Sequence, residues 1–276
     1  MATHDYVIDN STGANVRSDL NNVLQAILTN NSSGSAPSTT AAYMLWADTS
    51  NNILKMRNSA NDGWIDLRTL TGGITSTADA TINSITVGKG ANSANGNTVL
   101  GETALDASVS GTNNTAIGKD TLTALTSGQQ NVAVGANAGD AITTGSNNTA
   151  VGKGSLSTAT TASDNTAFGE SALNQNSSGA NNTALGAQCL DANTTASDNT
   201  GVGKNSLTTN STGASNTAIG KSSLASNTTA SNNCAVGATA LNANTTGDKN
   251  NAFGSATLET NTTGTENSAF GSRALQ

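Results

Sequence analysis

The sequence predicts an all-β fold, a parallel β-solenoid of ten 17-residue coils, on three observations. Glycines that follow an apolar residue recur at one constant interval from Gly101, Gly118 and Gly135 onward to Gly271, without insertion or deletion. The apolar runs before these glycines, such as NTAIG, are too short for a helix. The intervening segments, such as NTTG, have turn composition, because Gly and Asn accept positive φ. Such a period is typical of coils that stack on their neighbours.

The repeat has a fixed pattern when each glycine is numbered as position 1. Position 5 is Leu except at Gly139, position 14 is always Asn, and position 16 is Ala except at Gly201. Position 17 is always aliphatic or aromatic, whereas the stretch before position 14 varies. We expect a strand over positions 14–17, a second strand near positions 3–5, and a loop over positions 7–13.

Two columns of residues follow from this stacking. Adjacent strands lie about 4.8 Å apart, so an Asn repeated in every coil is expected to form a side-chain amide ladder. The predicted ladder is Asn114, Asn131, Asn148, Asn165, Asn182, Asn199, Asn216, Asn233, Asn250 and Asn267. The predicted apolar core of the repeat is position 17, with Ile117, Val134, Val151, Phe168, Leu185, Val202, Ile219, Val236, Phe253 and Phe270.

The chain before the repeat begins with a predicted helix. Residues 1–40 are expected to hold a short amphipathic helix over about 15–29, followed by a linker. The apolar spacing is carried by Val16, Leu20, Val23 and Ile27. This helix either seeds a three-stranded bundle or packs on its own chain.

A second small element is expected over residues 41–72. Three apolar segments separated by turns predict a β-meander that contains both tryptophans, Trp46 and Trp64. These tryptophans form either the core of the meander, which we favour, or a platform for a sugar. Residues 73–100 are expected to be an irregular lead-in to the repeat domain, residues 101–276.

Composition excludes several classes of protein. The net charge of −7 argues against a nucleic-acid partner, because phosphate binding needs clustered Lys and Arg. No run of 18 apolar residues predicts a membrane span, and the first residues lack the features of a secretory signal. Only 11% of residues are charged and one is proline, unlike most disordered chains.

Catalytic and metal chemistry lack their usual residues. His4 is the sole histidine, so no Ser-His-Asp or Cys-His site is expected. Cys189 and Cys234 lie two coils apart, too far for an intrachain disulfide, and are expected to be reduced. Asp164 and Asp198 recur in ASDNT but do not match a calcium-binding repeat. We therefore expect no enzyme, no cofactor and no metal.

Charged residues at position 2 indicate a solvated face. Glu102 and Lys119, and also Lys153 and Glu170, would lie on adjacent coils as exposed pairs. Such pairs contribute little to stability.

Energetics indicate an oligomer. Each coil offers two large apolar side chains, about 1.5–3 kcal/mol apiece when buried, against about 1 kcal/mol or more to order each residue. An isolated chain is therefore marginal, and association would bury a second face.

The pattern NTAIGxxSL…TG resembles the head repeats of YadA-like trimeric adhesins and the 17-residue repeats of bacteriophage tail fibres and other viral fibres. Asn114–Gly118, Asn148–Gly152 and Asn216–Gly220 carry the resemblance, which covers about two thirds of the chain. It implies a homotrimer. The signal peptide, coiled-coil stalk and membrane barrel of a trimeric autotransporter are not in the sequence. The segment beginning WADT is similar to a small module near the N-termini of phage fibre proteins, which implies that residues 1–72 attach the fibre to the particle.

These features lead to one expected function and two alternatives. We expect a trimeric tail fibre or spike on a virion, made in the host cytoplasm. It would be attached through residues 1–72 to other virion proteins and would bind a glycan or surface protein of the host. The first alternative is a fibre that decorates the capsid or spaces a receptor-binding partner. The second is an ice-binding solenoid, although the Thr at position 15 is interrupted at Val132, Cys234 and Ser268.

Overall fold

The structure is a computed structural model that describes residues 13–28, 32–38, 40–69, 79–107 and 109–276. The chain forms two compact units, Met1–Ala78 and Asp79–Gln276. Residues 1–12, which include His4, and residues 70–78, which include the start of the expected lead-in, lie outside the described residues.

The first unit contains a helix and a small sheet. Helix α1 spans Gly13–Leu28, close to the predicted range. Strands β1 (Leu45–Asp48), β2 (Ile53–Arg57) and β3 (Trp64–Thr69) form an antiparallel meander in the order β1-β2-β3. A bulge between Leu54 and Lys55 shifts the register of β2 and β3.

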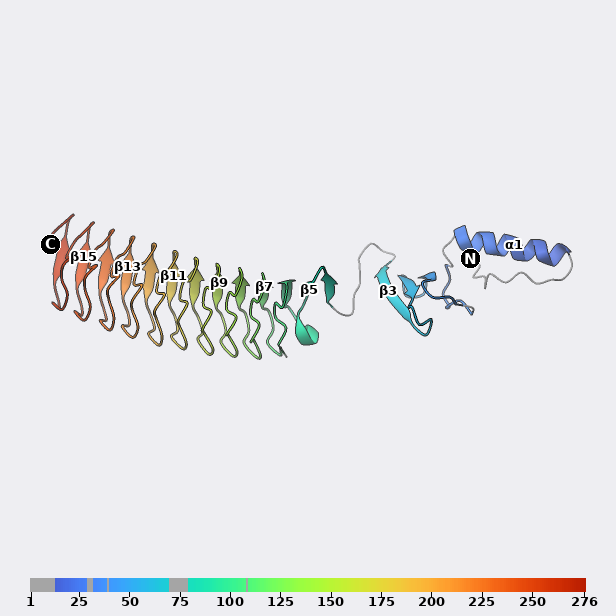
Figure 1. Cartoon of the computed structure of the whole chain (residues 1–276), viewed down its shortest axis with the longest axis horizontal. Helices are drawn as coiled ribbons and strands as arrows, with labels where there is room; N and C mark the ends of the chain where they lie inside the picture. Colours follow the sequence, from blue (N-terminus) through green and yellow to red (C-terminus); the bar gives the residue numbers. More distant parts are fainter. Residues whose placement is uncertain (1–12, 29–31, 39, 70–78, 108) are drawn as a thin grey trace. The chain divides into compact units, whose positions relative to one another are not determined.

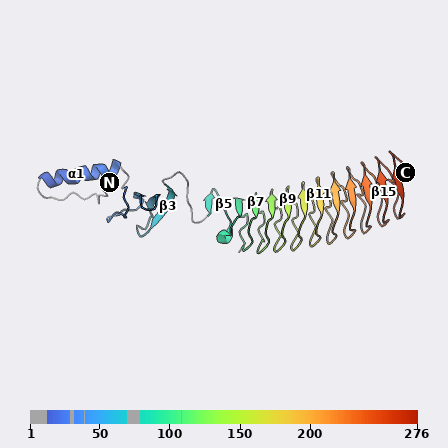
Figure 2. The same ribbon diagram turned by 180° about the vertical axis from the view of Figure 1, so that it is seen from behind.

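The second unit is a parallel β-solenoid, whose stacked coils are seen in Figures 1 and 2. A hairpin of β4 (Ala80–Ile82) and β5 (Ile85–Gly88) pairs antiparallel with β6 (Thr98–Gly101), and a short 3-10 turn covers Ala91–Ser93. The parallel strands that follow are β7 (Thr115–Ile117), β8 (Val132–Val134), β9 (Thr149–Val151), β10 (Thr166–Phe168), β11 (Thr183–Leu185), β12 (Thr200–Val202), β13 (Thr217–Ile219), β14 (Cys234–Val236), β15 (Asn251–Phe253) and β16 (Ser268–Phe270). Each strand residue pairs with its equivalent in the next coil, as Thr166 does with Thr183.

The solenoid begins earlier than the sequence pattern suggested. Strand β6 already pairs in parallel with β7, and Asn97 and Val99 occupy the places of positions 14 and 16. Residues 97–100 were expected to be part of an irregular lead-in, and this boundary is corrected to the first strand of the solenoid.

Each described coil of the repeat contains one strand, over positions 15–17. The second strand expected near positions 3–5 is absent, because the backbone there turns through positive φ at positions 3 and 5. Leucine rarely adopts this conformation. Leu122, Leu156 and Leu207 nevertheless have φ of 49°, 50° and 52° and are fully buried. Burial in the coil interior therefore outweighs the local backbone strain.

The interior of the coil is narrow. Successive side chains of a strand point to opposite faces, so positions 15 and 17 share one face and position 16 takes the other. Position 16 faces inward, as at the fully buried Ala167 and Ala184, and packs with the leucine of position 5. Phe168 is 52% exposed and Leu185 is 46% exposed. The prediction that position 17 forms the core is therefore corrected: within one chain it lies on the outer face.

Candidate functional site

The asparagines at position 14 form a continuous ladder inside the solenoid. In a typical step, the backbone N–H and Nδ2 of Asn182 both donate to Oδ1 of Asn165, over 3.0 and 3.1 Å. Nδ2 of Asn182 also donates to the carbonyl of Ala196 over 2.9 Å. Because each amide serves two coils, the ladder ties every coil to its neighbour without leaving its own polar atoms unpaired.

A second asparagine ladder lies at position 8, which sequence analysis treated as variable. Its members are buried or half-buried, and each one after the first donates from Nδ2 to Oδ1 of the preceding member over 2.8–3.1 Å. They are Asn176, Asn193, Asn210, Asn227, Asn244 and Asn261. Leu125 and Ile142 fill the same place in earlier coils. The constant interval between these asparagines, the same as that of the glycines, was the signal that would have revealed this ladder.

An apolar row runs along the outer face of the sheet. We call it the apolar stripe: Leu100 followed by the position-17 residues Ile117, Val134, Val151, Phe168, Leu185, Val202, Ile219, Val236, Phe253 and Phe270. No polar residue interrupts the stripe in strands β6 to β16. Phe253 and Phe270 stack with ring centroids 5.0 Å apart and planes inclined by 2°. Phe270 is 72% exposed.

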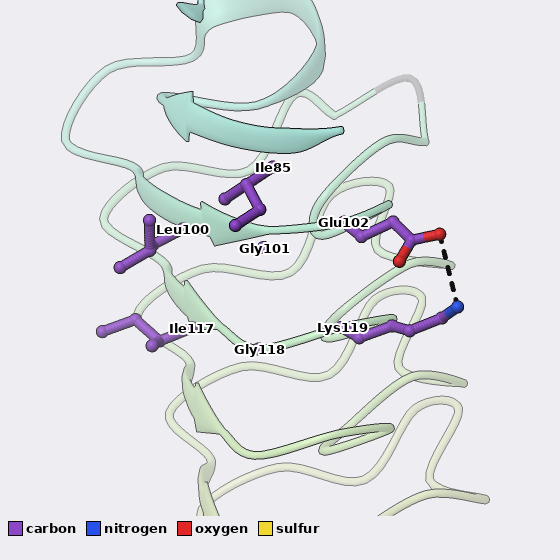
Figure 3. A pocket seen from close by; sticks show the side chains of 7 residues that line it. All are labelled: Ile85, Leu100, Gly101, Glu102, Ile117, Gly118 and Lys119. Carbon is purple, nitrogen blue, oxygen red and sulfur yellow. Dashed lines mark hydrogen bonds and ion pairs between the residues drawn. The ribbon is translucent and has the colours of Figure 1, made fainter. Parts of the chain in front are cut away.

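A hollow of about 420 Å³ lies where the stripe begins (Figure 3). Its apolar wall is Ile85, Leu100 and Ile117. The ion pair of Glu102 with Lys119 lies on the other side of Gly101 and Gly118, with Nζ and Oε1 3.3 Å apart. The hollow is therefore the first part of the apolar stripe, and its polar edge is this one exposed ion pair.

The column beside the stripe is position 15. Thr covers most of it, but Val132, Cys234, Asn251 and Ser268 interrupt it. An ice-binding solenoid would need a regular array of threonines to order water. The threonine column at position 15 is interrupted, so this face does not carry such an array.

Surface ion pairs follow the stacking only in part. Glu102 and Lys119 pair across adjacent coils as expected. Lys153 and Glu170 form no ion pair in the described chain, whereas Lys249 and Glu266, at position 13, lie 3.3 Å apart. All four paired side chains are about half exposed or more, so these contacts contribute little.

The tryptophans pack together in the meander. The ring centroids of Trp46 and Trp64 are 5.2 Å apart, and Trp46 is buried. Lys55 Nζ lies 5.4 Å from the centroid of Trp46, and Arg57 Cζ lies 5.2 Å from that of Trp64. A cation therefore lies near each ring, and the buried Trp46 offers no open face to a sugar.

Asp48 holds the turn that follows β1. Its carboxylate is buried, accepts hydrogen bonds from Ser50 and Asn51, and lies 3.3 Å from Lys55 Nζ. Burial alone would raise its pKa, but the hydrogen bonds from Asn51 and the contact with Lys55 outweigh burial and hold the pKa of Asp48 below its ordinary value. The carboxylate therefore acts as a structural anchor for the turn.

The remaining candidate groups lie apart from one another. Cys189 is buried, Cys234 is half-buried, and both are free thiols. Asp164 and Asp198 are exposed and accept hydrogen bonds from Asn147 and Asn181. Among the described residues, no three His, Cys, Asp or Glu side chains converge as a metal site would require.

Two findings concern the whole described chain. No helix in the described ranges is both long enough and apolar enough to cross a membrane. Comparison of the chain with protein-family models, with curated proteins and with solved structures finds no match.

Proposed function

We propose that this protein is the subunit of a homotrimeric tail fibre or spike on a bacteriophage or other virus particle, attached through its N-terminal region and contacting the host. The observation that carries the proposal is the apolar stripe. A row of aliphatic and aromatic side chains, each half-buried or exposed and unbroken from Leu100 to Phe270, is a surface that self-association would cover.

The size of the stripe favours a stable interface. Five of its side chains are 40–72% exposed: Leu100, Phe168, Leu185, Ile219 and Phe270. The largest apolar patch of a typical monomer is about 300–600 Å², and larger patches mark interaction sites. A stable interface buries about 800 Å² per partner, so the columns that flank the stripe would have to take part in the contact.

The repeat supports association between copies of the same chain. Successive stripe residues are one strand spacing apart, about 4.8 Å, and a second copy carries the same row at the same spacing. Two or three identical solenoids therefore match along their length, whereas a globular partner would contact only a few coils. Helix α1 supports the same conclusion, since Leu20 and Leu24 are 45% and 50% exposed and are placed to form a helix bundle.

Association is tested by the mass of the full chain in solution. We expect three times 27.2 kDa by sedimentation equilibrium. A double variant of the stripe, Phe168→Asp with Leu185→Asp, should sediment as a monomer and keep its β-sheet circular dichroism, because these side chains lie outside the coil interior. The matched control is Ser178→Asp with Thr195→Asp, on the exposed column at position 10, and should remain trimeric. A parent chain that sediments as a monomer would overturn the proposal.

The role on the particle needs its own experiment. Antibodies raised against residues 101–276 should label projections on virus particles from the source that encodes the chain, viewed by electron microscopy. Deleting residues 1–72 should give free trimers that no longer assemble onto particles, whereas deleting residues 271–276 should leave attachment intact. The reverse result would place the attachment end at the C-terminus.

A further inference from the structure

The meander of the first unit has two faces of different chemistry. In its register, Leu45 pairs with Met56 and Met56 pairs with Ile65, while Ala47 pairs with Leu54. Paired residues lie on the same face of a sheet. These five apolar residues therefore share one face, which we call the apolar face of the meander.

The opposite face carries the tryptophans and the charges. Lys55 bridges Asp48 and Asp66 over 3.3 and 3.4 Å on that side. A small antiparallel sheet normally buries its apolar face and exposes its polar one. Here Trp46 and Asp48 on the charged side are buried, while Ile65 on the apolar side remains 46% exposed. The apolar face is therefore the surface that still needs a cover.

The size of this face restricts what covers it. Its larger side chains, Leu54, Met56 and Ile65 among them, offer at most a few hundred Å², well below the roughly 800 Å² per partner of a stable interface. Its residues also carry no charge with which to attract or select a separate protein. A freely diffusing partner would thus dissociate readily. The group that packs on the apolar face must therefore already be held close to it.

A second copy of this chain meets that condition if the solenoids associate. Residues 70–78 join the meander to the solenoid, and nine residues span at most about 30 Å. Meanders on associated solenoids would therefore remain within tens of Å of one another. Tethers of this length give effective concentrations in the millimolar range, at which a small apolar contact is largely occupied.

We propose that the apolar face of the meander packs against the same faces of the other copies of this chain, around the axis of the oligomer, once the apolar stripe has brought the copies together. This inference rests on the proposed self-association of the solenoid and adds a second interface to it. The N-terminal region is then an ordered oligomeric base in which the charged face of each meander points outward.

Disulfide trapping in the full chain tests the interface. The background carries Cys234→Thr, because Thr is the usual residue at position 15, and Cys189 is buried. In this background, the Ile65→Cys variant should form disulfide-linked dimers under mild oxidation. The matched control is Ser59→Cys, at the exposed β2–β3 turn and off the apolar face. We expect cross-linking of Ile65→Cys to be several-fold faster than that of Ser59→Cys.

Combining Ile65→Cys with Phe168→Asp and Leu185→Asp separates this inference from the proposed function. Cross-linking should then disappear, because the tether is lost. A monomeric parent chain would overturn both proposals. An oligomeric chain in which Ile65→Cys cross-links no faster than Ser59→Cys would overturn only the meander interface.

Two further outcomes would also overturn the inference. If Ile65→Cys resists an alkylating reagent but forms no product between chains, a segment of its own chain covers the face. If cross-linking persists after the stripe is disrupted, the face associates without the tether and the argument from its small area is wrong.

Discussion

Asn165 and Asn176 belong to different columns of the solenoid, yet both donate from Nδ2 to the same carbonyl oxygen, that of Gly179, each over 2.9 Å. The carbonyl uses both of its lone pairs, and the two ladders become one network. Networks of this kind are stable only when every member is paired, because a single buried group without a partner costs its full desolvation.

Replacing one ladder asparagine should therefore cost more than its own hydrogen bonds. Asn210 donates to Oδ1 of Asn193 over 3.0 Å and accepts from Nδ2 of Asn227 over 2.8 Å. Asn210→Leu leaves both of those groups without this partner, at about 1–3 kcal/mol each. We expect that loss in the free energy of urea-induced unfolding. Thr212→Ala, on the exposed position-10 column, should change it by less than about 0.5 kcal/mol; equal effects would contradict the ladder.

The glycine at position 1 should tolerate no side chain. Gly186 has φ of 141°, and a Cβ there would lie 2.6 Å from the carbonyl carbon of Gly203 in the next coil. Gly186→Ala combines backbone strain with a clash against main chain, which cannot rotate away. We expect a loss of at least about 2 kcal/mol, measured by chemical unfolding. Ala187→Ser, at position 2 where Ser also occurs, is the control and should unfold like the parent.

The constant period of the sequence predicted much of this fold. The parallel stacking, the register and the asparagine column at position 14 all followed from it, because identical positions in stacked coils must lie above one another. It did not reveal which face of the strand is inside. Alternation places Phe168 and Ala167 on opposite faces, and hydrophobicity alone favours Phe168 for the core. Leu173 and Ala167 are both fully buried in one core, so the interior holds the leucine of position 5 with the methyl group of position 16.

Other features depend on three-dimensional context. Leucine at position 5 takes a left-handed conformation that its local preference opposes, and that preference predicts a strand there. The apolar face of the meander was also not predicted, because it depends on the strand register, which places Leu45, Met56 and Ile65 on one side. In both cases the tertiary structure decides what local sequence preference does not.

Stability should depend on pH through one buried thiol. Burial raises the pKa of Cys189 to about 12 from an ordinary value of 9.0. Between these values the unfolded chain releases a proton that the folded chain keeps, so the free energy of unfolding falls as pH rises. The loss is up to about 1.4 kcal/mol per pH unit and is absent below pH of about 8.

The matched variant for this pH dependence is Cys189→Ser, because Ser occupies position 4 in other coils, as at Ser206. The free energy of unfolding is measured for parent and variant from pH 7 to 11. The difference between them reports the ionisation of Cys189, because the other groups that titrate in alkali are the same in both proteins. Curves that run parallel across this range would show that Cys189 ionises equally in both states.

The last prediction concerns Gly201, the one glycine at position 16 in strands β7 to β16. A Cβ built on Gly201 would lie 2.5 Å from Sγ of Cys189, so the thiol occupies the space that an alanine methyl takes in the other coils. Gly201→Ala should overpack this coil and cost about 1–3 kcal/mol. Cys189→Ala alone should cost about 1 kcal/mol through the small cavity that it leaves. The double variant restores the Ala–Ala pairing of positions 4 and 16 seen at Ala172 and Ala184, and it should unfold close to the parent. A double-mutant cycle by chemical unfolding measures this coupling. Additive losses would show that the side chains of residues 189 and 201 do not compete for the same space. The presence of glycine at Gly201 would then need another explanation.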